Sequence, residues 1–217
     1  MKIWIVSATE AEFSIAHNAH IAKTFNSDNI IEWFDIGVGI VPSVFNLMIR
    51  LKADKPDLII NVGIAGAIDK KIHLGETLLI ERDEFFQWGS EDIEGFLDVF
   101  ALGFVNPNEK PFKDGKLYAS GNYLKNQLSH LRKVNGITVQ KVHGNQHSIN
   151  QLQESCTGIH VESMEGAAVL YVAEMLDIPA IQIRSISNYV EPRNRENWKI
   201  TEAIENLNHQ IINILTT

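Results

Sequence analysis

Apolar runs and amphipathic segments alternate along the chain. Short apolar runs bounded by turn residues predict buried β-strands. They cover residues 3–8, 30–36, 58–62, 77–80, 137–142 and 180–186. Other segments place apolar residues three and four positions apart, which predicts helices. They cover residues 10–22, 42–52, 164–176 and 201–215. The alternation favours a layered α/β sandwich around a parallel or mixed central sheet.

Residues 85–116 interrupt this alternation. They have no clean period, contain Pro107 and Pro111, and are rich in Phe and Trp. Such a segment predicts an irregular excursion from the sheet. A loop in water carries fewer aromatic residues, so we expect the excursion to pack as a small satellite core. A pocket cover and a subunit contact are the alternatives.

Length and charge narrow the class of protein. The 217 residues, 45% of them hydrophobic and 21% charged, predict a single globular domain over residues 1–217. The 19 Lys and Arg against 27 Asp and Glu give a net charge of -8, which disfavours nucleic acid and anionic membranes as partners. We expect no membrane span, because no apolar run approaches about 18 residues. A lone Cys156 and an N-terminus unlike a signal peptide indicate a cytoplasmic protein.

Glycine-containing turns follow three of the predicted strands, at residues 37–39, at residues 63–66 and at Gly144. Ligands of α/β proteins bind beyond the carboxyl ends of strands, where glycine lets the backbone approach them closely. The first turn lacks the third glycine of a dinucleotide fingerprint, and nothing matches a Walker phosphate loop. We therefore predict no nucleotide cofactor. Each turn taken alone is also explained by a structural role.

Two glutamates, Glu162 and Glu165, lie where a predicted strand gives way to a helix. Stabilisation of a helix N-terminus explains such carboxylates without any function. The strand over residues 180–186 continues into Ser187 and Asn188, and sheet geometry brings this end to the same edge. We therefore expect the carboxylates and these polar groups to meet in one site.

On these segments the chain resembles the purine nucleoside phosphorylase and nucleosidase superfamily, in its hydrolytic branch with the methylthioadenosine/S-adenosylhomocysteine nucleosidases. The resemblance runs along essentially the whole chain. It rests on residues 1–3, 8–12, 37–39, 61–66, 164–165 and 184–188, which match in order and spacing. It implies a three-layer α/β/α sandwich with a central mixed sheet, action on a purine nucleoside, no cofactor, and a homo-oligomer that we expect to be a dimer.

Within that superfamily, residues 161–168 and 185–195 look most like the futalosine hydrolases of menaquinone biosynthesis. This likeness implies hydrolysis of futalosine to hypoxanthine and dehypoxanthine futalosine. Three alternatives stay open: a methylthioadenosine/S-adenosylhomocysteine nucleosidase, a purine nucleoside phosphorylase, and a non-catalytic nucleoside-binding protein. Phosphorylase relatives place Arg in or near the glycine loops, whereas residues 37–41 and 63–66 contain none.

The resemblance assigns roles at the reacting centre. Glu12 looks like the general base that accepts a proton from the attacking water. Glu165 looks like the carboxylate that holds the ribose hydroxyls, with Met164 against the sugar. Asn188 stands where adenine-releasing nucleosidases carry the Asp that protonates N7 of the leaving base. An amide cannot give up such a proton, but it can hydrogen-bond N7 or O6 of a 6-oxopurine, so Asn188 favours hypoxanthine over adenine.

Further residues are expected around the substrate. The matching motifs place Gly39, Ala65, Gly66 and Ser187 there. His147 lies near the position of an aromatic residue that stacks on the base in the resembling nucleosidases.

Arg193 and Arg195 follow Pro192 in a segment too polar for the core. Futalosine carries a benzoate on its side arm, and Arg binds carboxylates well, so either residue is a candidate contact. Exposure to solvent without any substrate contact is the alternative.

Three other residues need an interpretation. His143 and His147 have the four-residue spacing of a metal pair, but no third ligand is evident, so we predict no metal site. Arg184, inside a predicted strand, is interpreted as structural and as needing a carboxylate partner.

Overall fold

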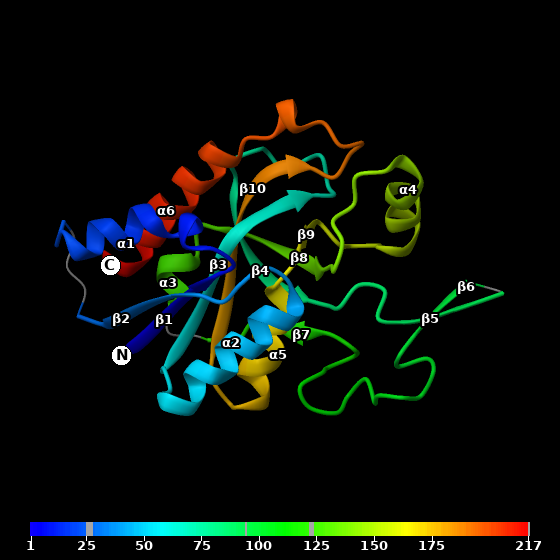
Figure 1. Cartoon of the computed structure of the whole chain (residues 1–217), viewed down its shortest axis with the longest axis horizontal. Helices are drawn as coiled ribbons and strands as arrows, with labels where there is room; N and C mark the ends of the chain where they lie inside the picture. The colour runs from blue at the N-terminus through cyan, green and yellow to red at the C-terminus, as the bar shows by residue number, and fades with distance from the viewer. Residues whose placement is uncertain (25–27, 94, 122–123, 217) are drawn as a thin grey trace.

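The computed structural model describes residues 1–24, 28–93, 95–121 and 124–216 (Figure 1). Its strands are β1 (Lys2–Ser7), β2 (Ile30–Asp35), β3 (Leu58–Ala67), β4 (Thr77–Asp83), β5 (Gly89–Asp92), β6 (Gly95–Asp98), β7 (Leu117–Tyr118), β8 (Arg132–Thr138), β9 (Val161–Ser163) and β10 (Ala180–Tyr189). Its α-helices are α1 (Ser14–Ile21), α2 (Ile40–Ala53), α3 (Lys125–Leu128), α4 (Gln146–Ser155), α5 (Gly166–Met175) and α6 (Ile200–Thr216), with 3-10 helices η1 (Glu10–Glu12) and η2 (Arg195–Asn197).

The central sheet closes on itself. β3 pairs with β10 in parallel, and the pairings β10–β4, β4–β8, β8–β9 and β9–β3 lead back to the same strand. β1 and β2 extend from β3 as parallel strands, and the short β7 pairs with β4. The mixed sheet of an α/β fold is therefore confirmed, but the three-layer sandwich is confirmed only loosely, because five of the strands form a barrel-like sheet.

Strand length explains the closure. β3 and β10 are ten residues each, and they stay in parallel register over nearly their whole length. The predicted strands at 58–62 and 180–186 stop too early, because β3 continues through the glycines at 63–66 and β10 continues through Asn188. The segment 63–66 is therefore strand and not a turn. Its far end pairs with the three-residue β9, which joins β3 to β8.

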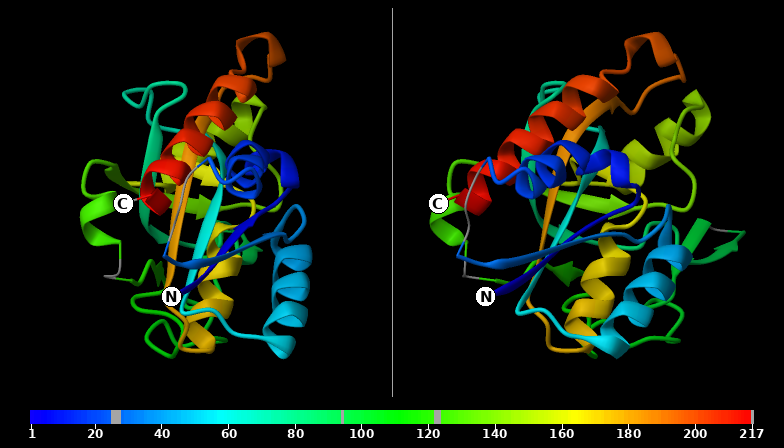
Figure 2. Two further views of the ribbon diagram at one scale, coloured as in Figure 1. Left: turned by 90° about the vertical axis from the view of Figure 1, so that its left-hand side faces the viewer. Right: turned by 60° about the vertical axis from the view of Figure 1, so that its left-hand side comes forward.

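Helices cover both faces of the extended sheet (Figures 1 and 2). β1 alternates between the two cores: Ile3 and Ile5 pack with α1, α3 and α6, whereas Trp4 and Val6 pack with α2 and α5. In the views, α1 runs beside α6 and α2 beside α5. This alternation of apolar side chains is what gives the sandwich part of the fold its layers.

Several predicted boundaries move in the structure. Residues 10–22 are not one helix, because Phe13 has a non-helical backbone (φ -121, ψ 1) that separates η1 from α1. The strand predicted at 137–142 ends at Thr138 and starts earlier, where β8 can pair with β4. The pattern also missed α4, which begins after Asn145 and is capped by that side chain.

The aromatic excursion at 85–116 folds back on the molecule. It contains the β5–β6 hairpin and a cluster of rings from Phe85, Trp88, Phe100 and Phe112, which reaches Tyr171 of α5. The satellite-core interpretation is confirmed for Phe85, Phe100 and Phe112, which pack into one hydrophobic core with α5. Trp88 and Phe104 are exposed, at 39% and 79%.

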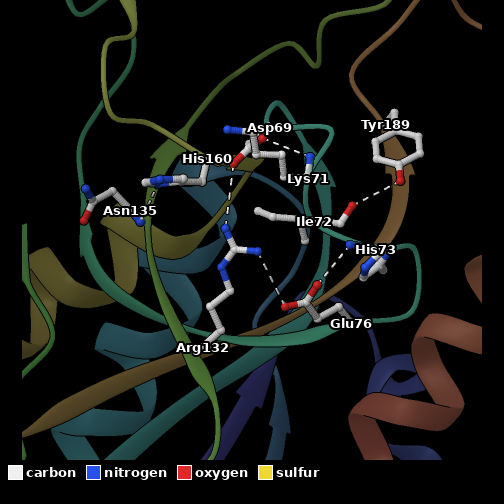
Figure 3. A network of polar contacts seen from close by, with 9 residues as sticks. All are labelled: Asp69, Lys71, Ile72, His73, Glu76, Arg132, Asn135, His160 and Tyr189. Carbon is white, nitrogen blue, oxygen red and sulfur yellow. Dashed lines mark hydrogen bonds and ion pairs between the residues drawn. The ribbon is translucent and has the colours of Figure 1, made fainter.

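A polar network fixes the connection between β3 and β4 (Figure 3). Arg132 of β8 lies 3.8 Å from Asp69 and 3.9 Å from Glu76, and Glu76 accepts a hydrogen bond from the His73 amide. The Tyr189 hydroxyl donates to the Ile72 carbonyl. The network therefore ties this connection to the end of β10 that carries Asn188.

Among the described residues, no helix is long and apolar enough to cross a membrane.

Candidate active site

A cavity of about 440 Å³ lies where β3, β9 and β10 meet the N-terminal end of α6. Its walls come from segments far apart in the sequence, and most of the predicted site residues line it. The lining residues used below are Glu12, Val38, Ala65, Gly66, His143, Glu162, Met164, Glu165, Ser187, Asn188, Tyr189, Arg193, Trp198, Ile200 and Ile204. The convergence expected at one edge of the sheet is therefore present.

Glu12 is held by backbone donors at the wall of the cavity. Its Oε2 accepts from the Thr9 amide at 3.0 Å, and its Oε1 accepts from the Ile64 amide at 3.1 Å. The side chain is nearly buried, and this burial raises the pKa of the Glu12 carboxyl, although Arg184 and the backbone hydrogen bonds lower it. A carboxylate with a raised pKa is a better proton acceptor than an exposed one.

Arg184 lies beside Glu12 in the barrel interior and is 1% exposed. Space for its guanidinium comes from Gly63, because a Cβ at that position would overlap Arg184 Nη1 and would lie 2.8 Å from Glu12 Oε1. Nε and Nη2 of Arg184 have no hydrogen-bond partner among the described residues. Glu12 is therefore the carboxylate that Arg184 needs nearby. The two interact through their charges, without a direct ion pair.

A second buried carboxylate, Asp83, lies deeper in the barrel. It accepts hydrogen bonds from Thr138 Oγ1 at 2.9 Å and from Gln182 Nε2 at 3.1 Å. Burial raises the pKa of Asp83 to about 6, with these hydrogen bonds and Arg184 opposing the shift. The interior of the barrel therefore holds a polar network that no apolar-strand pattern predicts.

Glu165 is placed by the start of α5. It is the residue before the first helical position, it is 7% exposed, and its Oε1 accepts a hydrogen bond from the Gly39 amide at 2.9 Å. Gly39 has φ +87, a backbone conformation that favours glycine. Gly39, which is expected to contact the substrate, lies outside the described cavity lining and is connected to the site by its hydrogen bond to Glu165.

Asn188 is oriented by its neighbours in β10. Ser187 Oγ donates to Asn188 Oδ1 at 2.8 Å, and Asn188 Nδ2 donates to the Tyr189 carbonyl at 3.0 Å. The register shifts between Ile186 and Asn188 against β3, so Asn188 stands opposite Gly66. A bulge of this kind re-aims a side chain, and here Asn188 lines the cavity.

The two candidate arginines differ in position. Arg193 lines the cavity, and its guanidinium lies 4.9 Å from the centre of the Trp198 ring. Arg195, 5.8 Å from the same ring, lies outside the described lining of the cavity. His147 is exposed on the first turn of α4 and is also outside that lining. The structure thus brings Arg193 to the site but not Arg195 or His147.

Sequence reasoning misses one residue of the cavity wall and one residue that supports it. His143 lines the cavity and bonds Glu162, whereas the sequence suggested only a metal pair with His147. Asn208 of α6 is fully buried and clamps the segment that carries Glu12: it donates to the Glu12 carbonyl and accepts from the Ala16 amide. The signal for Asn208 was a polar residue beside the apolar face of a predicted helix.

Metal binding and thiol chemistry find no support among the described residues. Among the described residues, no group of three or more His, Cys, Asp or Glu side chains is arranged to hold a metal ion. Cys156 is half-buried, and burial raises the pKa of its thiol to about 12, so it carries little thiolate at neutral pH.

Comparison with known proteins finds chains that are similar in sequence and in fold. A futalosine hydrolase of Streptomyces coelicolor is 28% identical over 148 residues, which is 68% of this chain and 60% of that protein's length. A methylthioadenosine/S-adenosylhomocysteine nucleosidase of S. pneumoniae, solved with a transition-state inhibitor, superposes with a TM-score of 0.79 at 18% identity, over 100% of this chain and 99% of that one. A futalosine hydrolase of Helicobacter pylori superposes with a TM-score of 0.75 at 15% identity, over 99% and 97%.

A match to a family model over most of the chain identifies the family. The sequence model of the phosphorylase superfamily matches residues 33–216, which include Glu165, Asn188 and most of the cavity wall. Because this match covers most of the chain, the protein belongs to the phosphorylase superfamily, and its named relatives include hydrolases and nucleosidases.

Proposed function

We propose that the protein is a nucleosidase that hydrolyses the N-ribosyl bond of futalosine and releases hypoxanthine. The observation that carries this proposal is an amide, Asn188, in a cavity that also holds the carboxylates of Glu12 and Glu165. The likeness to futalosine hydrolases supports the choice of substrate. The role in menaquinone biosynthesis and the cytoplasmic location belong to the same proposal.

The two carboxylates divide the work at the sugar. Hydrolysis passes through a sugar with positive charge on the ring, attacked by a water from one face. Glu12, with its raised pKa, accepts the proton of that water. Glu165, fixed by the Gly39 amide, binds the ribose hydroxyls and places negative charge near the developing cation.

The amide acts on the leaving base. Because Ser187 donates to Oδ1 of Asn188, the Nδ2 group is set as a donor, and it carries a second hydrogen besides the one given to Tyr189. That hydrogen suits O6 or N7 of a 6-oxopurine. Arg193 and Trp198 form the outer wall, where the carboxylate of the futalosine side arm would bind Arg193.

A methylthioadenosine/S-adenosylhomocysteine nucleosidase is the second candidate, favoured by the close superposition on the S. pneumoniae enzyme. A phosphorylase is less well supported, because the glycine segments lack Arg for a phosphate. A non-catalytic nucleoside-binding protein would not need Glu12 held by two amides inside the cavity.

Product analysis separates these candidates. The purified protein is incubated with futalosine, inosine and methylthioadenosine, each with and without phosphate, and the released base and sugar are identified by chromatography. Hypoxanthine from futalosine without phosphate is the expected result. Adenine from methylthioadenosine would favour the second candidate, a requirement for phosphate would indicate a phosphorylase, and no release from any substrate would indicate a binding protein.

Asn188→Asp tests the selectivity assigned to the amide. A carboxyl at this position can protonate the base, so we expect the variant to gain activity on methylthioadenosine and to lose part of its activity on futalosine. Unchanged activity on both substrates would contradict the role of Asn188.

A further inference from the structure

His143 and Glu162 form a buried pair in the wall of the cavity. His143 Nδ1 lies 2.6 Å from Glu162 Oε2, and the His143 amide donates to Glu162 Oε1 at 3.0 Å. The two side chains are 5% and 3% exposed. The Phe86 and His143 rings pack edge to face, with ring centres 5.3 Å apart. Both oxygens of the carboxylate are thus used to hold one histidine.

The pair lies next to Asn188. A Cβ built on Gly66 would be 3.3 Å from Asn188 Nδ2 and 3.5 Å from Glu162 Cγ, so the two side chains converge around this glycine. The loop that carries His143 is also tied to the outer wall, because the Arg193 amide donates to the Gly144 carbonyl at 3.0 Å. His143, Glu162, Asn188 and Arg193 all line the same cavity.

Asn188 can hydrogen-bond the leaving base but cannot give it a proton. When the bond from the sugar to the purine breaks, both of its electrons leave with the base, and a base that leaves as an anion is a poorer leaving group than a protonated one. Histidine is the side chain that acts most often as a general acid, and a carboxylate on Nδ1 leaves Nε2 as the nitrogen that can face a substrate.

Resting on the proposed function, we infer that His143 is the proton donor to the leaving purine and that Glu162 is the residue that positions its imidazole. With Nδ1–H bonded to Glu162, Nε2–H is the donor towards the base.

The step balances without a further reactant. The C1′–N9 bond breaks and its electron pair goes to the purine, which takes the Nε2 proton of His143 at a ring nitrogen. Water forms the new C1′–O bond and gives a proton to Glu12. After the products leave, Glu12 returns its proton to solvent and His143 takes one up, so the net reaction consumes only water and the nucleoside.

Leaving-group dependence tests this assignment. His143→Gln keeps a side chain of similar reach that cannot act as an acid. On inosine, whose purine leaves more readily when it is protonated, we expect kcat/KM to fall by at least about 100-fold, the lower end of general-acid contributions. On p-nitrophenyl β-D-ribofuranoside, whose leaving group departs as a stable anion, we expect a change of less than about threefold. Glu162→Gln should show the same preference with a smaller loss on inosine.

His209→Gln is the matched control, because this exposed histidine of α6 lies outside the described cavity wall. It should leave both substrates unaffected. An equal loss on both substrates in His143→Gln would show a structural role and overturn the inference, and so would no loss on inosine.

A series of 6-substituted purine ribosides gives an independent readout. The loss caused by His143→Gln should grow as the free base becomes less acidic, and a constant loss across the series would overturn the inference. If the wild-type protein cleaves none of the purine nucleosides, the proposed function itself fails. If it cleaves them, only the variant's leaving-group dependence decides the role of His143.

Discussion

At the scale of single residues, the first prediction concerns Glu12, the proposed general base. Its carboxylate must be unprotonated to accept a proton, and burial raises its pKa above the ordinary 4.5. Activity should therefore fall as the pH drops through this raised pKa, with an acid limb of kcat/KM at higher pH than an ordinary glutamate gives. The pH profile of kcat/KM on futalosine measures this limb.

Glu12→Gln should lower kcat by about 10² to 10⁴-fold and remove the acid limb that Glu12 causes. The exposed Glu10, two residues earlier, provides the control, because Glu10→Gln should keep both the rate and the limb. A Glu12→Gln variant that keeps the same limb would show that another group titrates there.

Arg193 and Arg195 allow a second prediction at this scale. Arg193 lines the cavity and Arg195 does not, although both guanidinium groups lie over the Trp198 ring. Arg193→Gln should raise KM for futalosine about tenfold or more and leave KM for inosine unchanged, because only futalosine carries the side-arm carboxylate. Arg195→Gln should have a smaller effect, and equal effects of Arg193→Gln on both substrates would rule out the carboxylate contact.

At the scale of elements, the buried Asp83 of the barrel lowers the free energy of unfolding at neutral pH. The pKa of Asp83 is about 6, against an ordinary value of 3.8, so the folded protein binds this proton more tightly than the unfolded chain. The free energy of unfolding should therefore fall as the pH rises from about 4 to 6, by on the order of 3 kcal/mol for this group.

Asp83→Asn should remove this fall and raise the free energy of unfolding at pH 7. The amide can be accommodated, because Gln182 Oε1 has no partner among the described residues and could accept from it after Gln182 turns over. Urea unfolding at several pH values provides the measurement, with the exposed Asp28→Asn as control. A pH dependence that survives in Asp83→Asn would place the titration on another group.

The sequence pattern predicts the long elements better than it predicts their partners. Apolar periodicity locates α2, α5 and α6 within a few residues, because each helix covers a core with one face. It cannot predict barrel closure, which depends on the three-residue β9 pairing with both β8 and β3. Such a strand is too short to show a period.

The sequence likewise predicts some residues of the site and misses others. Glu12, Glu165 and Asn188 were found through family motifs, and all three line one cavity. His143 was missed, because its partner Glu162 is 19 residues away in the sequence and only the fold brings the two together. His147 is expected at the base from its match in position, yet it is exposed on α4 and lies outside the described cavity wall.

At the scale of the whole molecule, α2 presents an apolar face that is exposed to solvent. Val41, Phe45 and Ile49 are 69%, 63% and 49% exposed, and Val38 just before them lines the cavity. We predict that the protein is a homodimer and that this face forms its contact. Phe45→Glu should therefore halve the mass measured by sedimentation at micromolar concentration.

Phe104→Glu provides the comparison, because Phe104 is the most exposed aromatic residue of the excursion at 85–116. It should leave the mass unchanged if α2 makes the contact. A monomeric wild type would contradict the dimer, and dissociation by Phe104→Glu alone would move the contact to the excursion.

The position of α6 has a consequence for synthesis. This helix follows all the other described elements, its Ile200 and Ile204 line the cavity, and its Asn208 clamps the segment that carries Glu12. Chains fold as they emerge from the ribosome, N-terminal parts first. A nascent chain with every strand made but without α6 would lack the Asn208 clamp on this segment. With Glu12 as the proposed general base, we expect activity only once α6 has left the ribosome.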